Sequence, residues 1–273
     1  MADLDAMIKL RQDNPGAYQV RGWVHSKMGD AERAISDFTE ALRLDPDRPV
    51  TLWYRGGALA SIGERTRALE DFDRAIKLQP DFAEAYADRC LTFIDLGIPD
   101  QGIPECTKAI DLAPNYPYGH ANRGYGYLTK HDIDRAVADF DHALRLAPNS
   151  AEIYSNRGAA FAERGDRDRA IADFDRAIEL APEYSMAYDN RGLIYFEKGD
   201  NARAIADLDK ALALDPKYWR AYFHRAMVKA HMGDSSGSFT DCGNALEFAP
   251  DPQAKLTYTV KGLVLSDTFS CSR

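Results

Sequence analysis

The stretch that decides the fold is AEIYSNRGAAFAERGDRDRAIADFDRAIELAPEY, residues 151–184. Its 34 residues are one copy of a unit that the chain repeats seven times. A proline recurs near the end of every copy, at intervals of 34 residues: Pro46, Pro80, Pro114, Pro148, Pro182, Pro216 and Pro250. A fixed period of this length indicates a repeat architecture, so the period has to be interpreted before any single motif.

Each repeat is predicted to form two helices joined by a short turn. With positions numbered 1 to 34 from the start of that stretch, Tyr154, Gly158 and Phe161 fall at 4, 8 and 11, which places them on one helical face. Gly165, at position 15, predicts the end of the first helix. A second apolar face follows at positions 20, 24 and 27, and Pro182 marks where that helix ends.

One helical pair cannot bury its apolar face alone, so the array is stable only when neighbouring pairs stack. The pattern resembles the tetratricopeptide repeat over residues 15–252, with no insertion or deletion. The resemblance implies an all-α fold, a right-handed α–α superhelix (solenoid) of seven helix-turn-helix repeats with a capping helix at each end. The seven repeats, called repeats one to seven below, are residues 15–48, 49–82, 83–116, 117–150, 151–184, 185–218 and 219–252.

The two ends of the chain depart from the repeat. Residues 1–14 match the second helix of a repeat that lacks its first, which predicts either a capping helix or the trimmed end of a longer array. Residues 253–273 are predicted to be a C-terminal capping segment and tail. Their helical spacing predicts a helix, although TYTVKG also alternates like a strand, and SDTFSCSR is expected to fray. The residues with helical spacing are Leu256, Val260, Leu263 and Val264.

The four cysteines are Cys90, Cys106, Cys242 and Cys271, and the first three occupy core positions of the repeat. The favoured interpretation is free thiols that pack as small hydrophobic side chains. A disulfide or redox switch between Cys90 and Cys106, which face each other within repeat three, is the alternative. Free thiols favour a reducing compartment.

Repeat three is the irregular one, because Pro104 and Gly102 interrupt its second helix. Pro104 can remove a backbone hydrogen bond and bend the helix. We expect either a drifted repeat with compensating packing or a weak seam in the array.

Composition bounds the class of protein. Hydrophobic residues make up 45 % of the 273 residues, as in folded globular chains, and no apolar run approaches the length of a membrane span. The acids in MADLDAMIKL do not suit a secretory signal, so a cytoplasmic location is expected. The net charge of −9 argues against nucleic-acid binding, which needs clustered basic charge.

Two charged positions recur in every repeat. Position 7 is always arginine and position 23 is always acidic, as in Arg157 and Asp173. The favoured interpretation is an ion pair that fixes the register of the two helices. The alternative is an arginine stripe that binds an anion.

The resemblance also implies that first helices line a concave groove through positions 2, 5, 6, 9, 12 and 13. Position 6 is asparagine in three consecutive repeats, at Asn122, Asn156 and Asn190. A carboxamide can pair with a peptide backbone without reading its side chains, so a peptide-binding asparagine ladder is one interpretation. An ordinary polar surface is the other.

The remaining groove residues are mostly acidic or aromatic. The acids include Asp88, Glu152 and Asp189, and the aromatic residues include Trp53, Tyr54, Tyr125 and Phe196. Acids steer basic partners and aromatic side chains anchor interfaces, so a protein or peptide with basic and apolar residues is the predicted partner. Arg220 and His224 match the carboxylate clamp of chaperone-binding relatives only in part, because no repeat has lysine at position 2.

The predicted function is a non-enzymatic scaffold that binds a peptide segment in this groove. The sequence offers no phosphate loop, nucleophile elbow or metal motif, so no catalytic residue, metal or cofactor is expected. One alternative is a regulatory or assembly domain that forms homo-oligomers through the ends of the array. Another is that the chain is a fragment of a larger tetratricopeptide-repeat protein.

Overall fold

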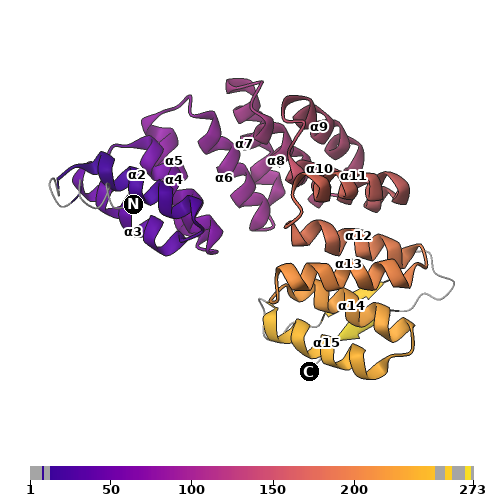
Figure 1. Ribbon diagram of the computed structural model, residues 1–273. Coiled ribbons are helices and arrows are strands. Elements are labelled where there is room, and N and C mark those ends of the chain that lie inside the picture. The colour runs from indigo at the N-terminus through magenta and orange to yellow at the C-terminus, as the bar shows by residue number, and fades with distance from the viewer. Residues whose placement is uncertain (1–7, 9–12, 250–255, 260–267, 272–273) are drawn as a thin grey trace. The chain divides into compact units, whose positions relative to one another are not determined.

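The computed structural model describes residues 8, 13–249, 256–259 and 268–271. In this part of the chain, one helix follows another along the sequence, and two short strands come after the last described helix (Figure 1). The helices of repeats one to four are α2 (Pro15–Lys27), α3 (Ala31–Leu44), α4 (Pro49–Ser61), α5 (Arg65–Leu78), α6 (Ala83–Asp95), α7 (Pro99–Leu112), α8 (Pro117–Thr129) and α9 (Ile133–Leu146). Those of repeats five to seven are α10 (Ala151–Arg164), α11 (Arg167–Leu180), α12 (Ser185–Glu197), α13 (Asn201–Leu214), α14 (Trp219–His231) and α15 (Ser235–Phe248).

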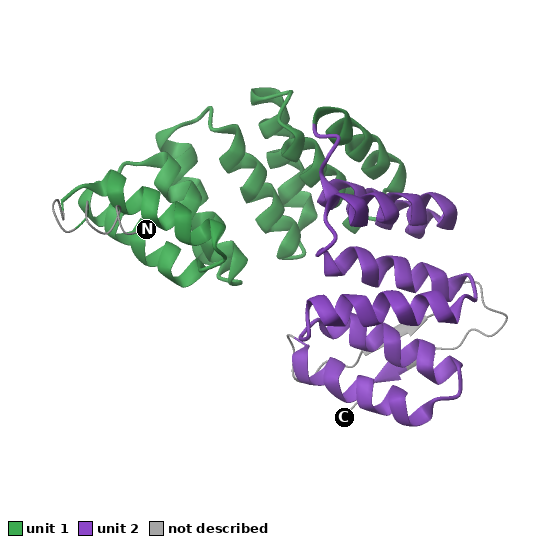
Figure 2. Ribbon diagram, in the orientation of Figure 1, with its two compact units in different colours: residues 1–146 green, residues 147–273 purple. Residues whose placement is uncertain are grey.

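The predicted all-α array of seven helix pairs is confirmed. Every repeat supplies two helices, and the first begins at repeat position 1. The chain divides into two compact units, residues 1–146 with repeats one to four and residues 147–273 with repeats five to seven (Figure 2).

The turn between the paired helices depends on a left-handed residue at position 15. In repeat five this is Gly165, with φ of 86°, which ends α10 and lets Asp166 cap α11 through the Arg169 N–H. Repeat four places His131 there, with φ of 58°, and it is the one residue other than glycine with positive φ in the described chain.

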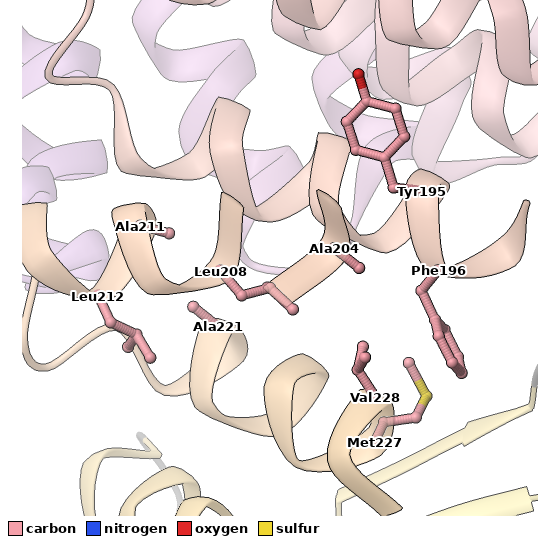
Figure 3. Close-up of a cluster of buried hydrophobic side chains, with 9 residues drawn as sticks. All are labelled: Tyr195, Phe196, Ala204, Leu208, Ala211, Leu212, Ala221, Met227 and Val228. Carbon is pink, nitrogen blue, oxygen red and sulfur yellow. The ribbon is translucent and has the colours of Figure 1, made fainter. Parts of the chain in front are cut away.

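In repeats one, two, four and five, the two helices of a pair approach closely because a glycine faces an aromatic ring. A Cβ built on Gly158 would lie 2.8 Å from the ring of Phe174, and one built on Gly56 would lie 2.6 Å from the ring of Phe72. Both rings are almost fully buried. Between pairs, apolar side chains from three consecutive helices form shared cores, such as the one that α12, α13 and α14 build around Leu208 and Val228 (Figure 3).

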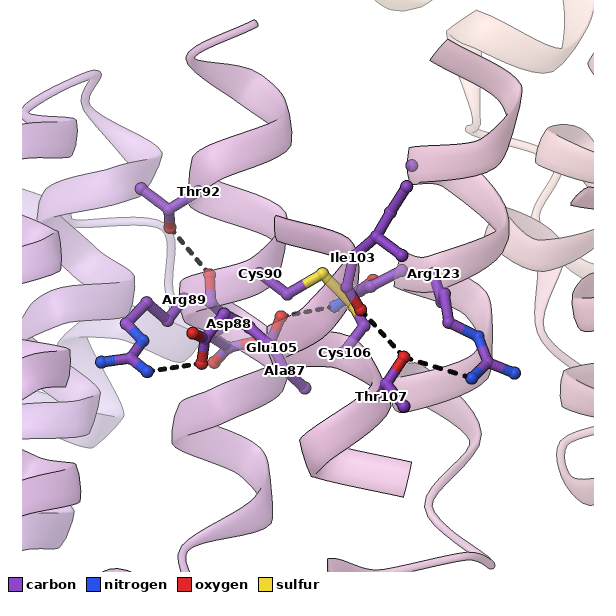
Figure 4. Close-up of a disulfide and its surroundings, with 12 residues drawn as sticks. Ala87, Asp88, Arg89, Cys90, Thr92, Ile103, Glu105, Cys106, Thr107 and Arg123 are labelled. Carbon is purple, nitrogen blue, oxygen red and sulfur yellow. Dashed lines mark hydrogen bonds and ion pairs between the residues drawn. A yellow bond between two sulfur atoms is a disulfide. The ribbon is translucent and has the colours of Figure 1, made fainter. Parts of the chain in front are cut away.

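In repeat three, a disulfide replaces this contact between a glycine and a ring. Cys90 of α6 and Cys106 of α7 take the places of the glycine and the aromatic residue, and their sulfur atoms are bonded (Figure 4). A second disulfide joins Cys242 to Cys271. The prediction of free thiols is therefore wrong, because a glycine and a phenylalanine position that touch also bring two cysteines within bonding distance. The inference of a reducing compartment loses its premise.

Pro104 lies inside α7, which nevertheless runs from Pro99 to Leu112. A Cβ built on Gly102 would lie 2.7 Å from the Cys90 carbonyl oxygen, so the two helices approach closely here. This contact fits the interpretation of repeat three as a drifted repeat with compensating packing.

The C-terminal segment differs from the predicted helix. Strands β1 (Leu256–Thr259) and β2 (Thr268–Cys271) form an antiparallel pair, with Leu256 opposite Cys271. The prediction of a capping helix is therefore wrong at Leu256. The strand-like alternation of TYTVKG is confirmed over residues 257–259. The prediction of a frayed end is wrong for the residues of β2. Val260, Leu263 and Val264 lie outside the described residues.

The predicted N-terminal half-repeat, residues 1–14, also lies largely outside the described residues. Ile8 is helical and buried.

Candidate functional site

The repeated arginine and acid form the predicted ion pair in all seven repeats. Each arginine of the first helix holds the carboxylate of the second, at 2.6–2.8 Å in six repeats and through Arg89 and Glu105 in repeat three. The hydrogen bond with Asp207 holds the pKa of Arg191 above its ordinary value. Because carboxylates already bind these guanidinium groups, the alternative of an anion-binding arginine stripe is wrong.

The same arginines also join successive repeats. Within each compact unit, the arginine Nη1 atom donates to position 25 of the preceding repeat, as Arg191 does to Asp175 at 2.5 Å and Arg225 to Asp209 at 2.6 Å. Thr39, Asp73 and Thr107 accept in the same way within the first compact unit. Position 25 is therefore the acceptor of a polar seam between repeats.

A second polar contact links position 5 of one repeat to position 6 of the next, 35 residues later. Trp53 Nε1 donates to Asp88 Oδ2 at 2.6 Å. Asn122 Nδ2 donates to the Ala87 carbonyl at 3.0 Å. Sequence reasoning missed this contact, although the constant spacing of 35 residues was there to suggest it.

The third contact between position 5 of one repeat and position 6 of the next joins Asp189 Oδ1 to His224 Nδ1, which are 2.7 Å apart. Both side chains are buried, and Asp189 is 0 % exposed. These two predicted groove residues therefore bind each other.

On α6, Asp88 lies among aromatic side chains of its own repeat and of the neighbouring repeats. The acid–aromatic cluster comprises Trp53, Glu84, Asp88, Tyr116 and Tyr118. Burial raises the pKa of Asp88 to about 6, the Trp53 hydrogen bond opposes that rise, and the Glu84 charge adds to it. Burial, followed by the charges of Asp88 and Glu84, raises the pKa of Tyr116. The ring centroids of Tyr116 and Tyr118 are 5.6 Å apart, and Tyr118 is 42 % exposed.

Tyr116 was not among the predicted site residues. It occupies position 34, the last of repeat three, outside the groove positions that the resemblance implies. Tyr184 and Tyr218 recur at the same position, and that recurrence was the available signal.

The three asparagines differ in exposure. Asn122 is buried and bound to its own chain, whereas Asn156 and Asn190, in the second compact unit, are half-buried. Glu152 and Arg220 of that unit are exposed. The asparagine ladder stays a prediction.

The predicted aromatic anchors also differ in how exposed their side chains are. Trp53, Tyr54 and Tyr125 are half-buried. Phe196 is only 2 % exposed and packs in the core shared by α12, α13 and α14 (Figure 3), where its ring meets His231 edge-on at 5.4 Å. The structure thus buries Phe196 instead of leaving it as a surface anchor, because a residue in the last turn of a first helix can point into the core between repeats.

Comparison with protein families matches most of the chain to one kind of repeat. Models described as tetratricopeptide repeats match residues 20–81, 58–117 and 124–194, and one described as a TPR repeat matches residues 192–233. A search of curated proteins found no match.

Solved structures share the fold at low sequence identity. The APC/C hetero-tetramer Cut9–Hcn1 is 18 % identical with a TM-score of 0.73, and the match covers 83 % of this chain and 45 % of that one. A tetratricopeptide repeat protein from Parabacteroides merdae is 20 % identical with a TM-score of 0.67, covering 88 % and 94 %. Yeast Tom70 is 19 % identical with a TM-score of 0.65, covering 91 % and 54 %. The chain thus spans about half the length of two of these three structures, and the likeness shows the fold.

No helix in the described part of the chain is both long and apolar enough to cross a membrane.

Proposed function

The chain belongs to the tetratricopeptide repeat family, whose fold is typical of protein–protein interaction scaffolds, and from that premise we propose that it is a non-enzymatic scaffold. Its ligand is a peptide segment of a partner protein that carries basic and apolar side chains. The binding surface is formed by first helices of the repeats.

The acid–aromatic cluster is the observation that carries this proposal. Glu84 and Asp88 are one turn apart on α6, so their carboxylates share a helical face. Rings of Trp53, Tyr116 and Tyr118 belong to the same cluster. Aromatic faces attract ammonium and guanidinium groups, and partial burial strengthens that attraction. A lysine or arginine side chain would thus meet both charge and ring faces here.

Apolar anchoring has candidates in the same compact unit. Val20 and Trp23, at positions 6 and 9 of repeat one, are 47 % and 41 % exposed. Aromatic side chains on an accessible surface are favoured anchors in protein interfaces. These residues suit the apolar side chains of the proposed ligand.

In the second compact unit, Asn156 and Asn190 support the recognition of a peptide backbone. A half-buried carboxamide retains donor and acceptor capacity, so it can bind the N–H and C=O of an extended segment. Exposed Glu152 adds negative charge on α10, which favours a basic segment there too.

Selection from a displayed library of unstructured peptides tests the proposal. We expect the full chain to enrich peptides with lysine or arginine beside apolar residues. The Glu84→Gln/Asp88→Asn variant should lose that enrichment. Glu32→Gln/Glu70→Gln is the matched control, because it removes the same charge from exposed positions on the second helices α3 and α5.

Equal enrichment by the two double variants would contradict a role for the cluster, and a selection without basic peptides would overturn the proposed ligand. The Asn156→Ala/Asn190→Ala variant separately tests the backbone contacts. If those contacts form, this variant should weaken binding of all selected peptides, whatever their side chains.

A further inference from the structure

The outer face of α15, the last helix of the array, carries a groove of about 630 Å³. The α15 groove is lined mainly by Ser238, Phe239, Cys242, Gly243 and Leu246, with Cys271 of β2 at one side. Phe239 is 82 % exposed. A phenylalanine so exposed beside an apolar groove marks an interaction surface.

The same position in inner repeats shows what Phe239 lacks. Position 21 is Ile35 in repeat one, where it packs beside Ala58 of the next repeat. Ile205, in repeat six, packs against the core that includes Val228 of repeat seven. Every inner residue at this position is at least partly buried. In the described chain, only Phe239 is exposed there.

A further repeat of the same kind does not suit this face. The polar seam needs an acceptor at position 25, such as Asp175 or Asp209. Repeat seven has Gly243 at position 25, and a Cβ built there would meet no atom of the described residues within 4 Å. An arginine from the first helix of an incoming repeat would find no carboxylate, so end-to-end stacking of copies would lose the polar seam here.

We propose instead that α15 pairs with α15 of a second copy, antiparallel across a two-fold axis. Phe239 and Gly243 are one helical turn apart on the same face, a projecting ring beside an open space. In an antiparallel pair each Phe239 ring meets the Gly243 of the other copy. A two-fold interface requires such a self-complementary patch.

The same register determines what the charge of Glu247 would face. Among the described residues that line the groove, Glu247 is the charged one, and it is exposed near the C-terminal end of α15. The register that sets Phe239 against Gly243 also sets Glu247 against Ser235, in the first turn of the other α15. A carboxylate is stabilised beside a helix N-terminus, and at this one Glu247 would lie near Asp234, which already caps α15 by accepting from the Gly237 N–H.

Sedimentation equilibrium of the full, oxidised chain tests this interface. We expect wild type to reach twice the chain mass as concentration rises. Phe239→Asp and Gly243→Phe should each stay monomeric, since one removes the ring and the other fills the space. Met28→Asp, an equally drastic change at an exposed residue far from α15 in the sequence, should dimerise as wild type does.

The Phe239→Ala/Gly243→Phe variant exchanges ring and space along the helix, so it should regain the dimer that Gly243→Phe alone loses. Circular dichroism confirms that each variant is folded. A monomeric wild type, or a dimer that Phe239→Asp leaves intact, would overturn the interface. A swapped variant that remains monomeric would overturn the antiparallel register.

Discussion

Single residues in this protein have their role set by their repeat position and by what faces that position. Gly56 and Gly57 are neighbours in α4, yet only the first faces a ring. A Cβ on Gly56 would lie 2.6 Å from Phe72, whereas a Cβ on Gly57 would meet nothing within 4 Å. The same residue type is thus required by packing at one position and merely tolerated at the next.

We predict opposite effects for these two glycines. Gly56→Ala should lower the free energy of unfolding by about 1–3 kcal/mol, because the methyl group overpacks a fully buried ring. Gly57→Ala should raise it by about 0.5–1 kcal/mol, because alanine loses less backbone entropy in a helix. Urea denaturation of both variants measures the difference, and equal effects would contradict the packing argument.

Asp88 predicts a particular dependence of stability on pH. Its folded pKa of about 6 lies above the value of about 3.9 for an unfolded aspartate. The folded state therefore binds the proton of the Asp88 carboxyl group more tightly than the unfolded state does. The contribution of Asp88 to the free energy of unfolding falls as pH rises from about 4 through 6. The free energy of unfolding of wild type, minus that of Asp88→Asn, should decrease over this range. Denaturant titrations at a series of pH values measure it, and a difference that rises with pH would be inconsistent with a raised pKa.

At the scale of elements, the helix pair of repeat three shows that one contact can be made by two chemistries. In five of the other repeats a glycine of the first helix faces an aromatic or leucine side chain of the second, as at Gly192 and Leu208, whereas repeat seven has Ala226 and Cys242 at these positions. In α6 and α7 the Cys90–Cys106 disulfide fills the same place, and both cysteines are 0 % exposed. With a sequence separation of 16 residues, loop-closure entropy assigns this bond about 3 kcal/mol of stabilisation.

A double-mutant cycle tests whether the two chemistries are equivalent. Cys106→Phe alone should destabilise the chain, because its ring meets the Cys90 side chain. Cys90→Gly alone should destabilise it by loss of the bond and by a cavity. The Cys90→Gly/Cys106→Phe variant restores the contact found in other repeats, so its loss should be smaller than the sum of the single losses by about 0.5–3 kcal/mol. Additive losses in thermal or urea unfolding would show that α6 and α7 cannot adopt the common packing.

At the scale of the whole molecule, stability is distributed along the chain. Within each compact unit, neighbouring repeats contact one another through shared cores and the polar seam, so stability is not concentrated in one core. The two compact units, residues 1–146 and 147–273, each contain at least three repeats and one disulfide. An array of this kind needs at least three repeats to be stable, and both units reach that number.

We therefore predict that residues 1–146 and 147–273 fold when produced separately. Each should show a helical circular dichroism spectrum and a cooperative thermal transition, and each should retain its own disulfide by mass spectrometry. Fragments cut within a repeat, such as 1–130 and 131–273, are the matched comparison and should be less stable, because the cut leaves α8 and α9 unpaired. A fragment 147–273 without cooperative unfolding would contradict nearest-neighbour stability.

The sequence by itself determined the helix pairs, the array of seven repeats and the arginine–acid ion pairs. These features depend on contacts between residues at a short, fixed separation in the sequence. The pair represented by Arg157 and Asp173 occurs in all seven repeats, so its spacing can be recognised from the sequence. Only the tertiary structure decided which polar side chains bind other groups of the same chain instead of facing solvent. Asp189 binds His224 and Asn122 binds the Ala87 carbonyl across repeats, while Cys242 is bonded to Cys271 in a strand. Their exposure depends on how neighbouring repeats pack, and a periodic pattern cannot distinguish a polar residue that faces solvent from one that faces the next helix.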